Sequence, residues 1–234
     1  MTRSAPEIAV STAIFALQPD RAPRSVLSLP LVVRTRDPYD GRWALPGGPL
    51  GEETLEDAAR RTLAATTGLE PAYLEQMYTF GDPDRSPDGH RVVSVVYWAL
   101  VRADEVSHAR PRQNVRWLPA DDLPVLAFDH NLIVEYALWR LRTKVSYGRI
   151  AHALLGETFT LRELREVHEI VRQTRLDPAN FRRQIESDGA VVPTGEMRTG
   201  GAHRPARLYR YNTEIEPVDL GPIARSGNLS EESS

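Results

Sequence analysis

The sequence predicts an α+β protein in two parts, a mixed α/β domain followed by a smaller domain of short helices and a β-hairpin. Three observations support this. Stretches rich in β-branched and apolar residues recur up to about residue 119 around one amphipathic helix. A long apolar helix is expected over residues 130–145. Helix-capping motifs and then two alternating stretches follow it. A chain of 234 residues is long enough for two such domains.

The strands of the first part are predicted from β-branched and apolar content. They cover residues 7–17, 26–34, 73–80, 90–101 and 114–119. Pro30 interrupts the second of them, and since proline cannot donate a ladder hydrogen bond, an edge or bulged strand is expected there.

Two helices belong to the first part. Over residues 53–67, Leu55, Ala58, Ala59 and Leu63 recur at a spacing of three to four, which places them on one face. The helix over residues 130–145 follows Asp129, the expected N-cap.

The second part reads as three helices and a hairpin, which is the element order of a winged helix. The first helix is expected over residues 146–155. Thr160 and Glu163 form a capping-box pattern for the second, and Asp177-Pro178 begins the third with a cap and a first-turn proline. Residues 190–211 alternate like two strands around a glycine-rich turn. We therefore expect domains at 1–144 and 145–212, followed by an acidic, disordered tail at 213–234.

Composition excludes several classes of protein. The chain has no cysteine, so it has neither disulfides nor a thiolate nucleophile. No apolar run is long enough for a transmembrane helix, and the polar N-terminus does not resemble a signal peptide, which favours a cytoplasmic protein.

The net charge of −3 conceals a basic segment, because residues 145–210 carry 11 basic and 8 acidic residues. Such an excess is compatible with nucleic acid binding.

The stretch GGPLGEETLEDAARRTLAATTGL at residues 47–69 carries a recognisable spacing. Gly47, Glu53, Arg61 and Gly68 match the skeleton of the Nudix box, in which a glycine turn leads into a helix that binds Mg²⁺ at a pyrophosphate. The box places glutamates at three further positions, and these are Thr62, Ala65 and Thr66 here. Because Mg²⁺ requires hard oxygen ligands, this helix is not expected to hold the metal.

Several further stretches strengthen a resemblance to the Nudix-related transcriptional regulator family. They are YTFGDPDR at 78–85, VVSVVYWALV at 92–101, LAFDH at 126–130 and FRRQI at 181–185. The resemblance extends to about residue 212. It implies a Nudix-like α/β/α sandwich with a mixed sheet, joined to a C-terminal winged helix-turn-helix domain.

The resemblance also implies a function. Members of this family repress bacterial genes of NAD synthesis and salvage as homodimers on palindromic double-stranded DNA, and ADP-ribose releases them. For this chain it implies an ADP-ribose effector with no required cofactor, no metal, no catalytic residue and no membrane partner.

Candidate effector-binding residues are those able to stack on adenine or to contact phosphate and ribose. Aromatic rings could stack on the base, and arginines or glycine N–H groups could meet phosphates. Tyr97 and His130 are further possibilities. The expected set is Arg34, Arg36, Trp43, Gly47, Gly48, Arg61, Phe80, Asp82 and Arg85.

Candidate DNA-binding residues lie on the third helix, at the start of the second and in the hairpin. Phe181 and Ile185 should face the core, which turns the polar residues of the third helix outward, where arginine can pair with guanine and asparagine with adenine. The expected set is Thr160, Asn180, Arg182, Arg183, Arg198, His203, Arg204 and Arg207.

Two alternatives stay open from the sequence. One is a Nudix hydrolase of ADP-ribose or another nucleoside diphosphate derivative, holding Mg²⁺ through Glu52, Glu53, Glu56 or an acid of residues 82–90. The other is a protein-interaction module in which the winged helix docks another protein; the acidic Glu196 in the hairpin is compatible with that.

Overall fold

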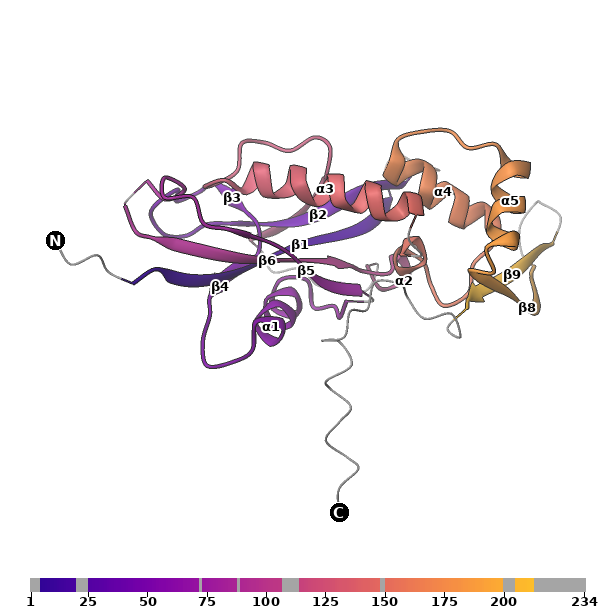
Figure 1. Cartoon of the computed structure of the whole chain (residues 1–234), viewed down its shortest axis with the longest axis horizontal. Helices are drawn as coiled ribbons and strands as arrows, with labels where there is room; N and C mark the ends of the chain where they lie inside the picture. The colour runs from indigo at the N-terminus through magenta and orange to yellow at the C-terminus, as the bar shows by residue number, and fades with distance from the viewer. Residues whose placement is uncertain are drawn as a thin grey trace, which may run out of the picture.

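The computed structural model describes residues 5–19, 25–71, 73–87, 89–106, 114–147, 150–199 and 205–212. A mixed-sheet domain and a smaller helical domain lie side by side and are joined by the long helix α3 (Figure 1). Two expected DNA contacts, His203 and Arg204, and the tail at 213–234 lie outside the described residues.

The described part of the first domain forms a seven-stranded mixed sheet. Its central path runs β3-β2-β1-β6-β5, while β4 pairs with β1 and β7 pairs with β2. The β1–β6 pair is parallel and all other pairs are antiparallel. The strands are β1 Glu7–Pro19, β2 Ser25–Val33, β3 Trp43–Ala44, β4 Gly47–Pro49, β5 Tyr73–Phe80, β6 Val92–Leu100 and β7 Val115–Pro119.

Helices cover both faces of this sheet (Figure 1). The strand β1 is buried on both sides, and its side chains alternate between two cores. Phe15 belongs to the core that includes the inner face of α3, whereas Ile14 packs with Leu63 of α1. The expected α/β/α sandwich is therefore confirmed. The helices of this domain are α1 Leu55–Thr67, the short α2 Ala103–Val106, which the sequence did not predict, and α3 His130–Tyr147.

The second domain has the element order of a winged helix. It contains the 3-10 helix η1 Ala151–Leu154, α4 Leu161–Arg172, α5 Pro178–Ser187, β8 Val191–Arg198 and β9 Ala206–Tyr211. Thr160 and Glu163 form the predicted capping box of α4. Asp177 caps α5, with Pro178 in the first turn. Phe159 adds an isolated bridge to Tyr209 of β9, so the hairpin is tied to the segment that precedes α4.

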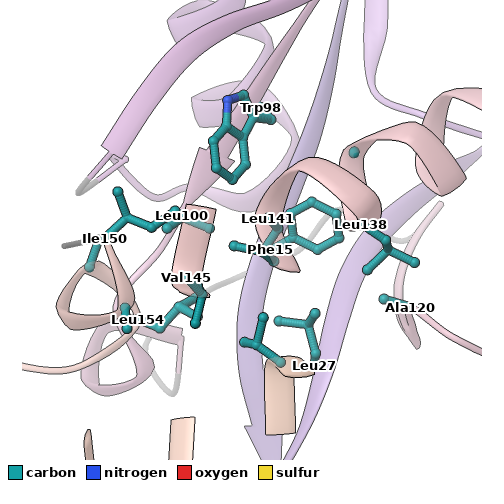
Figure 2. Packing of buried hydrophobic residues seen from close by; sticks show 14 of the residues in the cluster. Phe15, Leu27, Trp98, Leu100, Ala120, Leu138, Leu141, Val145, Ile150 and Leu154 are labelled. Atoms are coloured by element: carbon teal, nitrogen blue, oxygen red, sulfur yellow. The ribbon is translucent and has the colours of Figure 1, made fainter. Parts of the chain in front are cut away.

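The two domains share one hydrophobic core. Val145 at the end of α3 and Leu100 of β6 lie beside Ile150 and Leu154 around η1 (Figure 2). The same cluster continues into Phe181 of α5. The helix α3 runs to Tyr147, past the domain boundary expected at 144/145, and packs against α4. The junction is therefore a packed interface.

Pro30 lies where β2 is paired with β7 alone among the described residues, so the strand has one unpaired side at the proline, as the edge prediction expects. Two other local predictions were wrong. The first helix of the second domain is only the four-residue η1, since the chain is already extended at Leu155. The expected glycine turn at Gly47 and Gly48 is the strand β4, paired with β1.

Among the described residues, no helix combines the length and apolar character that a membrane span requires.

Candidate functional site

The loop at residues 34–42 packs on the segment at 126–130 through two arginines and two aromatic rings. The Arg34 guanidinium lies 4.6 Å from the centre of the Phe128 ring, and Arg42 lies 5.5 Å from that of Tyr39. Tyr39 and Phe128 meet edge to face at 5.0 Å. We call these four residues the arginine–aromatic cluster. Two cations beside two π-faces suit an anionic ligand that carries a flat base.

Backbone strain coincides with this cluster. Tyr39 and Phe128 have positive φ angles of 70° and 53°, a region that bulky side chains rarely adopt. Such conformations persist where the surrounding structure enforces them, and they concentrate at ligand sites. Arg34 helps to enforce the loop, because its Nε donates to the Pro38 carbonyl at 2.9 Å.

His130, the first residue of α3, is buried next to the cluster. Its Nδ1 accepts a hydrogen bond from the Leu45 N–H at 2.9 Å. Burial lowers the pKa of His130 to about 4, so the imidazole is neutral at pH 7 and Nδ1 is free of a proton. The contact fixes the chain between β3 and β4 against the start of α3.

Arg85 lies in the loop between β5 and β6 but is not a solvated residue. Its guanidinium forms two hydrogen bonds to the Asp129 carboxylate, at 3.0 and 2.7 Å, and a third to Ser94 at 2.7 Å. Only 5% of its side chain is exposed. The ion pair joins the β5–β6 loop to the start of α3. The Asp129 carboxylate, which was expected to cap that helix, is bound by Arg85 instead.

The remaining predicted effector residues of the sheet domain are spread out. Trp43 is half-buried, and its carbonyl accepts from the Ala127 N–H, so it adjoins the 126–130 segment. Phe80 instead packs with Tyr78 and Tyr136. Arg36 and Asp82 are exposed.

The two glycines of β4 differ in what they allow. A Cβ at Gly47 would lie 2.8 Å from the Val10 carbonyl oxygen, so glycine is required there for β4 to approach β1. A Cβ at Gly48 would meet nothing within 4 Å. The N–H groups of both glycines are not at a helix start, because α1 begins later, at Leu55 with Thr54 as its cap.

The three positions where the Nudix box places glutamates are occupied by packing residues or by a small exposed one. Thr62 and Thr66 are buried, and the Thr66 hydroxyl donates to the Thr62 carbonyl at 2.7 Å. Ala65 is exposed and has no oxygen in its side chain. A threonine hydroxyl satisfied within its own helix is a poor ligand for a divalent cation.

Three of the four acids nearby are already engaged, and the fourth, Glu52, is exposed. Glu53 is bound by Arg61 through contacts of 2.6–3.0 Å, and the hydrogen bond from Arg61 holds the pKa of Glu53 below its usual value. Glu56 pairs with Arg60 at 2.7 Å, and Asp57 is bound to Thr54. Arg61 is thus paired with Glu53, but 54% of its side chain is exposed, so its contact with a phosphate stays a prediction. Within the described ranges, no group of three His, Asp or Glu residues could hold a metal ion, so these residues do not fit the divalent metal that the Nudix fold implies.

The winged helix presents a basic hollow of about 450 Å³ between α4, α5 and β9. Thr160 and Leu161 at the start of α4 form one wall, and Phe181 of α5 and Tyr209 of β9 lie at the base. Four arginines line it, namely Arg162, Arg165, Arg182 and Arg207. This concentration of guanidinium groups beside a helix N-terminus suits a phosphate backbone.

The helix α5 turns its three predicted DNA-contact residues to solvent. Phe181 and Ile185 are buried, as predicted, while Asn180, Arg182 and Arg183 are exposed. Arg183 is bound to the Asn180 side chain, and Arg182 pairs with Glu186 at 3.0 Å. Exposed pairs of this kind contribute little to stability, so they can open for a ligand.

Two further predicted DNA contacts are engaged within the domain. Thr160 is buried, and its hydroxyl serves the capping box of α4. Arg198 of β8 binds the Glu163 carboxylate, which ties the wing to α4. Arg207 is exposed and has no ion pair with any residue that the structure describes.

The comparisons with known proteins agree on both domains. Residues 9–137 match the family model of the NUDIX domain, and residues 151–211 match that of the NrtR DNA-binding winged helix domain. A protein of Acinetobacter baylyi described as an ADPR responsive transcriptional repressor, NtrR, is 33% identical over 213 residues, covering 88% of this chain and 82% of the relative. The chain belongs to the NrtR family.

Solved structures of the NrtR family show the same architecture. The NrtR of Shewanella oneidensis in complex with a 27mer DNA has a TM-score of 0.77 and 34% identity, covering 88% of this chain and 93% of that one. Its Nudix domain in complex with ADP ribose has a TM-score of 0.50 and 33% identity, covering 59% of this chain and 90% of that one. An ADP-ribose pyrophosphatase of Methanocaldococcus jannaschii is 35% identical over 112 residues, covering 47% of this chain and 66% of the relative.

Within the NrtR fold of this chain, the structure gathers only some of the predicted residues. Arg34, Arg85 and Trp43 meet around residues 126–130, whereas Arg61 lies on the helix that covers the other sheet face (Figure 1). Sequence analysis missed Tyr39, Arg42 and Phe128. The stretch LAFDH contains Phe128 but does not by itself indicate a role for its ring, and no periodicity distinguishes a loop tyrosine.

Proposed function

We propose that this protein is a DNA-binding transcriptional repressor that ADP-ribose, or a related NAD-derived nucleotide, releases from its operator. The observation that carries the proposal is the pairing of an exposed arginine-rich face on the winged helix with a Nudix domain whose metal-ligand positions are threonine and alanine. The names of its relatives, a repressor responsive to ADP-ribose and a regulator crystallised with DNA, support it.

The effector site is assigned to the arginine–aromatic cluster and its surroundings. Arg34 and Arg42 would meet the diphosphate, and Tyr39 or Phe128 would stack on the adenine. Sequence analysis also proposes Arg36, Gly48 and Asp82 as effector-binding residues. They remain predictions, and we expect them at the rim of this site. No cofactor is required, and the protein acts in the cytoplasm.

The proposal includes the absence of hydrolysis, which the residues of α1 support. A sensor should bind its ligand without consuming it, and three acids near α1, Glu53, Glu56 and Asp57, are paired with Arg61, Arg60 and Thr54. Binding must then favour a conformation that fits DNA poorly, since a ligand changes an equilibrium only by its differential affinity.

The deciding experiment is a selection from sheared genomic DNA of the host, with and without millimolar ADP-ribose. Palindromic sites upstream of NAD-synthesis or salvage genes should be retained by the protein and lost when ADP-ribose is added. Retention of the same sites in ADP-ribose would reject this effector. No enrichment of any site would reject the repressor.

A second candidate is hydrolysis of ADP-ribose, which the similarity to an ADP-ribose pyrophosphatase favours. It is tested by incubating the protein with ADP-ribose and Mg²⁺ or Mn²⁺ and measuring AMP. Turnover that Glu53→Gln abolishes would establish the enzyme.

A protein-docking role for the winged helix is distinguished by the salt dependence of DNA binding, because binding to duplex DNA through arginines weakens steeply as the salt concentration rises.

A further inference from the structure

Two hollows adjoin one another beside α5, where the winged helix meets the end of α3. The first has a volume of about 340 Å³ and the second of about 260 Å³. Four residues line both hollows and so place them side by side, namely Ser146 of α3, His168 of α4, and Gln184 and Ile185 of α5. Together the hollows have the size of a small-molecule site, and they share no residue with the arginine–aromatic cluster.

The first hollow is largely apolar and has two stacked rings in its wall. His152 of η1 and Tyr211 of β9 are parallel to within 5°, with ring centres 3.8 Å apart. Asp188 is the carboxylate among its lining residues. The apolar side chains of the wall are Val145, Ala151, Leu164, Ile185, Ala190 and Val191. A wall of this composition suits a flat aromatic ring, which can pack on the apolar side chains and against the stacked rings.

The second hollow is basic. Arg172 at the end of α4 and Arg175 between α4 and α5 both line it. Neither side chain has an ion pair or a hydrogen bond with any residue that the structure describes, whereas Arg165 and Arg182 each pair with a glutamate. The carboxylate that lines this hollow, Asp177, accepts a hydrogen bond as the cap of α5. Two uncommitted guanidinium groups suit one anionic group of a ligand, a carboxylate or a phosphate.

His168 lies where the two hollows join and has unused hydrogen-bonding capacity. Its ring meets the Phe181 ring edge to face at 5.2 Å, but its nitrogens have no hydrogen bond within the described part of the chain. Burial and the positive charge of Arg172 lower the pKa of His168 to about 4, so at pH 7 the neutral ring offers one donor and one acceptor. A partly buried imidazole normally has a hydrogen-bond partner, so this one points to a polar group of a bound molecule.

We propose that the two hollows form a binding site for a small aromatic anion, which is a flat ring that carries a carboxylate or a phosphate group. The ring lies in the first hollow against His152 and Tyr211. The anionic group reaches Arg172 and Arg175 in the second hollow, and His168 donates a hydrogen bond to the ligand where the hollows join. The site does not depend on DNA or ADP-ribose binding, because it belongs to the free protein.

The test is an NMR titration of the full chain with four probes. Phenyl phosphate and benzoate, which combine a ring with an anionic group, should bind with millimolar dissociation constants, as expected for ligands of about ten non-hydrogen atoms. Benzamide lacks the charge and inorganic phosphate lacks the ring, so each should bind about tenfold more weakly or worse. The tighter of phenyl phosphate and benzoate identifies the preferred anionic group. Dissociation constants above about 10 mM for both would overturn the proposal.

Substitutions of exposed arginines locate the bound probe. Arg172→Gln should weaken phenyl phosphate binding by about tenfold or more, because it removes a guanidinium group and keeps a polar side chain. The matched control is Arg60→Gln on α1, which also removes an exposed arginine and should bind the probe as the native protein does. Unchanged binding by Arg172→Gln would overturn the proposal. Loss of binding in Arg34→Gln instead would also overturn it, because the probe would then occupy the arginine–aromatic cluster.

Discussion

Two histidines, the buried His130 and the partly buried His168, make the stability of the protein depend on pH. Burial lowers the pKa of each to about 4, and for His168 the positive charge of Arg172 contributes to that shift. In the unfolded chain both titrate near 6.5. Because the unfolded state then binds more protons, the stability that each neutral imidazole contributes is present above pH 6.5 and is lost as pH falls towards 4.

The variant His130→Asn should reduce this dependence. The carboxamide oxygen can still accept from the Leu45 N–H, but it does not titrate. Between pH 7.5 and pH 5 the native protein should lose roughly 2 kcal/mol of unfolding free energy at His130, and the variant should keep that amount. Urea denaturation at the two pH values measures it. Equal losses in both proteins would show that His130 does not titrate on unfolding.

Substitutions of single arginines in the winged helix should have two kinds of effect on DNA binding, one specific to the base sequence and one independent of it. Arg182→Ala on α5 is expected to weaken operator binding by about 1–3 kcal/mol and to relax specificity at one position of the site. Arg207→Ala beside the hollow should weaken binding to all sequences alike and reduce the salt slope by about 1. Fluorescence anisotropy on operator and scrambled DNA separates these effects. Arg60→Ala on α1 is the control, and a similar loss there would reject the assignment.

At the scale of elements, α3 is held along its length to β5 and its loop. At one end Arg85 binds Asp129, and at the other Arg140 and Lys144, one turn apart on α3, both bind Glu75 of β5, at 2.8 and 2.7 Å. Burial alone would raise the pKa of Glu75, but hydrogen bonds from Lys144, Tyr73 and Arg140 outweigh it and lower the pKa overall. The single lysine of the chain is thus a buried anchor, 4% exposed.

Lys144→Met should therefore destabilise the protein. Removal of one partner leaves the half-buried Glu75 carboxylate with fewer compensating contacts, and a loss of about 2–3 kcal/mol of unfolding free energy is expected. The matched control, Arg60→Met, breaks an exposed helix pair with Glu56 and should cost less than about 0.5 kcal/mol. The prediction fails if thermal or urea denaturation finds the two variants equally stable.

Most elements could be predicted from local chemistry, because caps and periodic burial act over a few residues. The capping box at Thr160, the Asp177 cap and the strand at 73–80 are examples. The predictions that failed concern residues whose structure depends on contacts with residues distant in the sequence. Pairing with β1 makes a strand of Gly47 and Gly48, and the ion pair with Asp129 buries Arg85. The clustering of Tyr39 with Phe128 is likewise a tertiary effect that no local pattern indicates.

At the scale of the whole molecule, α3 is the physical connection between effector and DNA domains. Its N-terminal end adjoins the arginine–aromatic cluster, and near its C-terminal end the Arg142 Nε donates to the Val171 carbonyl of α4 at 3.0 Å. Movement at one end can therefore change the orientation of α4, provided that the helix moves as a rigid body (Figure 1).

Arg142→Met tests this connection. DNA and ADP-ribose should each still bind, but the effect of ADP-ribose on DNA affinity should fall by about tenfold, since couplings of this type amount to about 1–3 kcal/mol. Asp121→Asn is the companion variant, because it alters the other partner of Arg142 and leaves the Val171 contact in place. Titration of DNA with and without ADP-ribose measures the coupling, and native-like release by Arg142→Met would exclude Arg142 from it.

The burial of Thr62 and Thr66 makes the departure from a metal site hard to reverse. A glutamate restored at either position would have to enter space that threonine now fills, and its carboxylate would be desolvated without a cation to compensate. Meanwhile Glu53 is bound by Arg61, so a metal would have to displace that guanidinium. Glutamate at either buried position would thus lower stability before any catalysis returned, whereas the exposed Ala65 sets no such barrier, so the two threonines are what keeps a lineage with this packing from regaining the metal site.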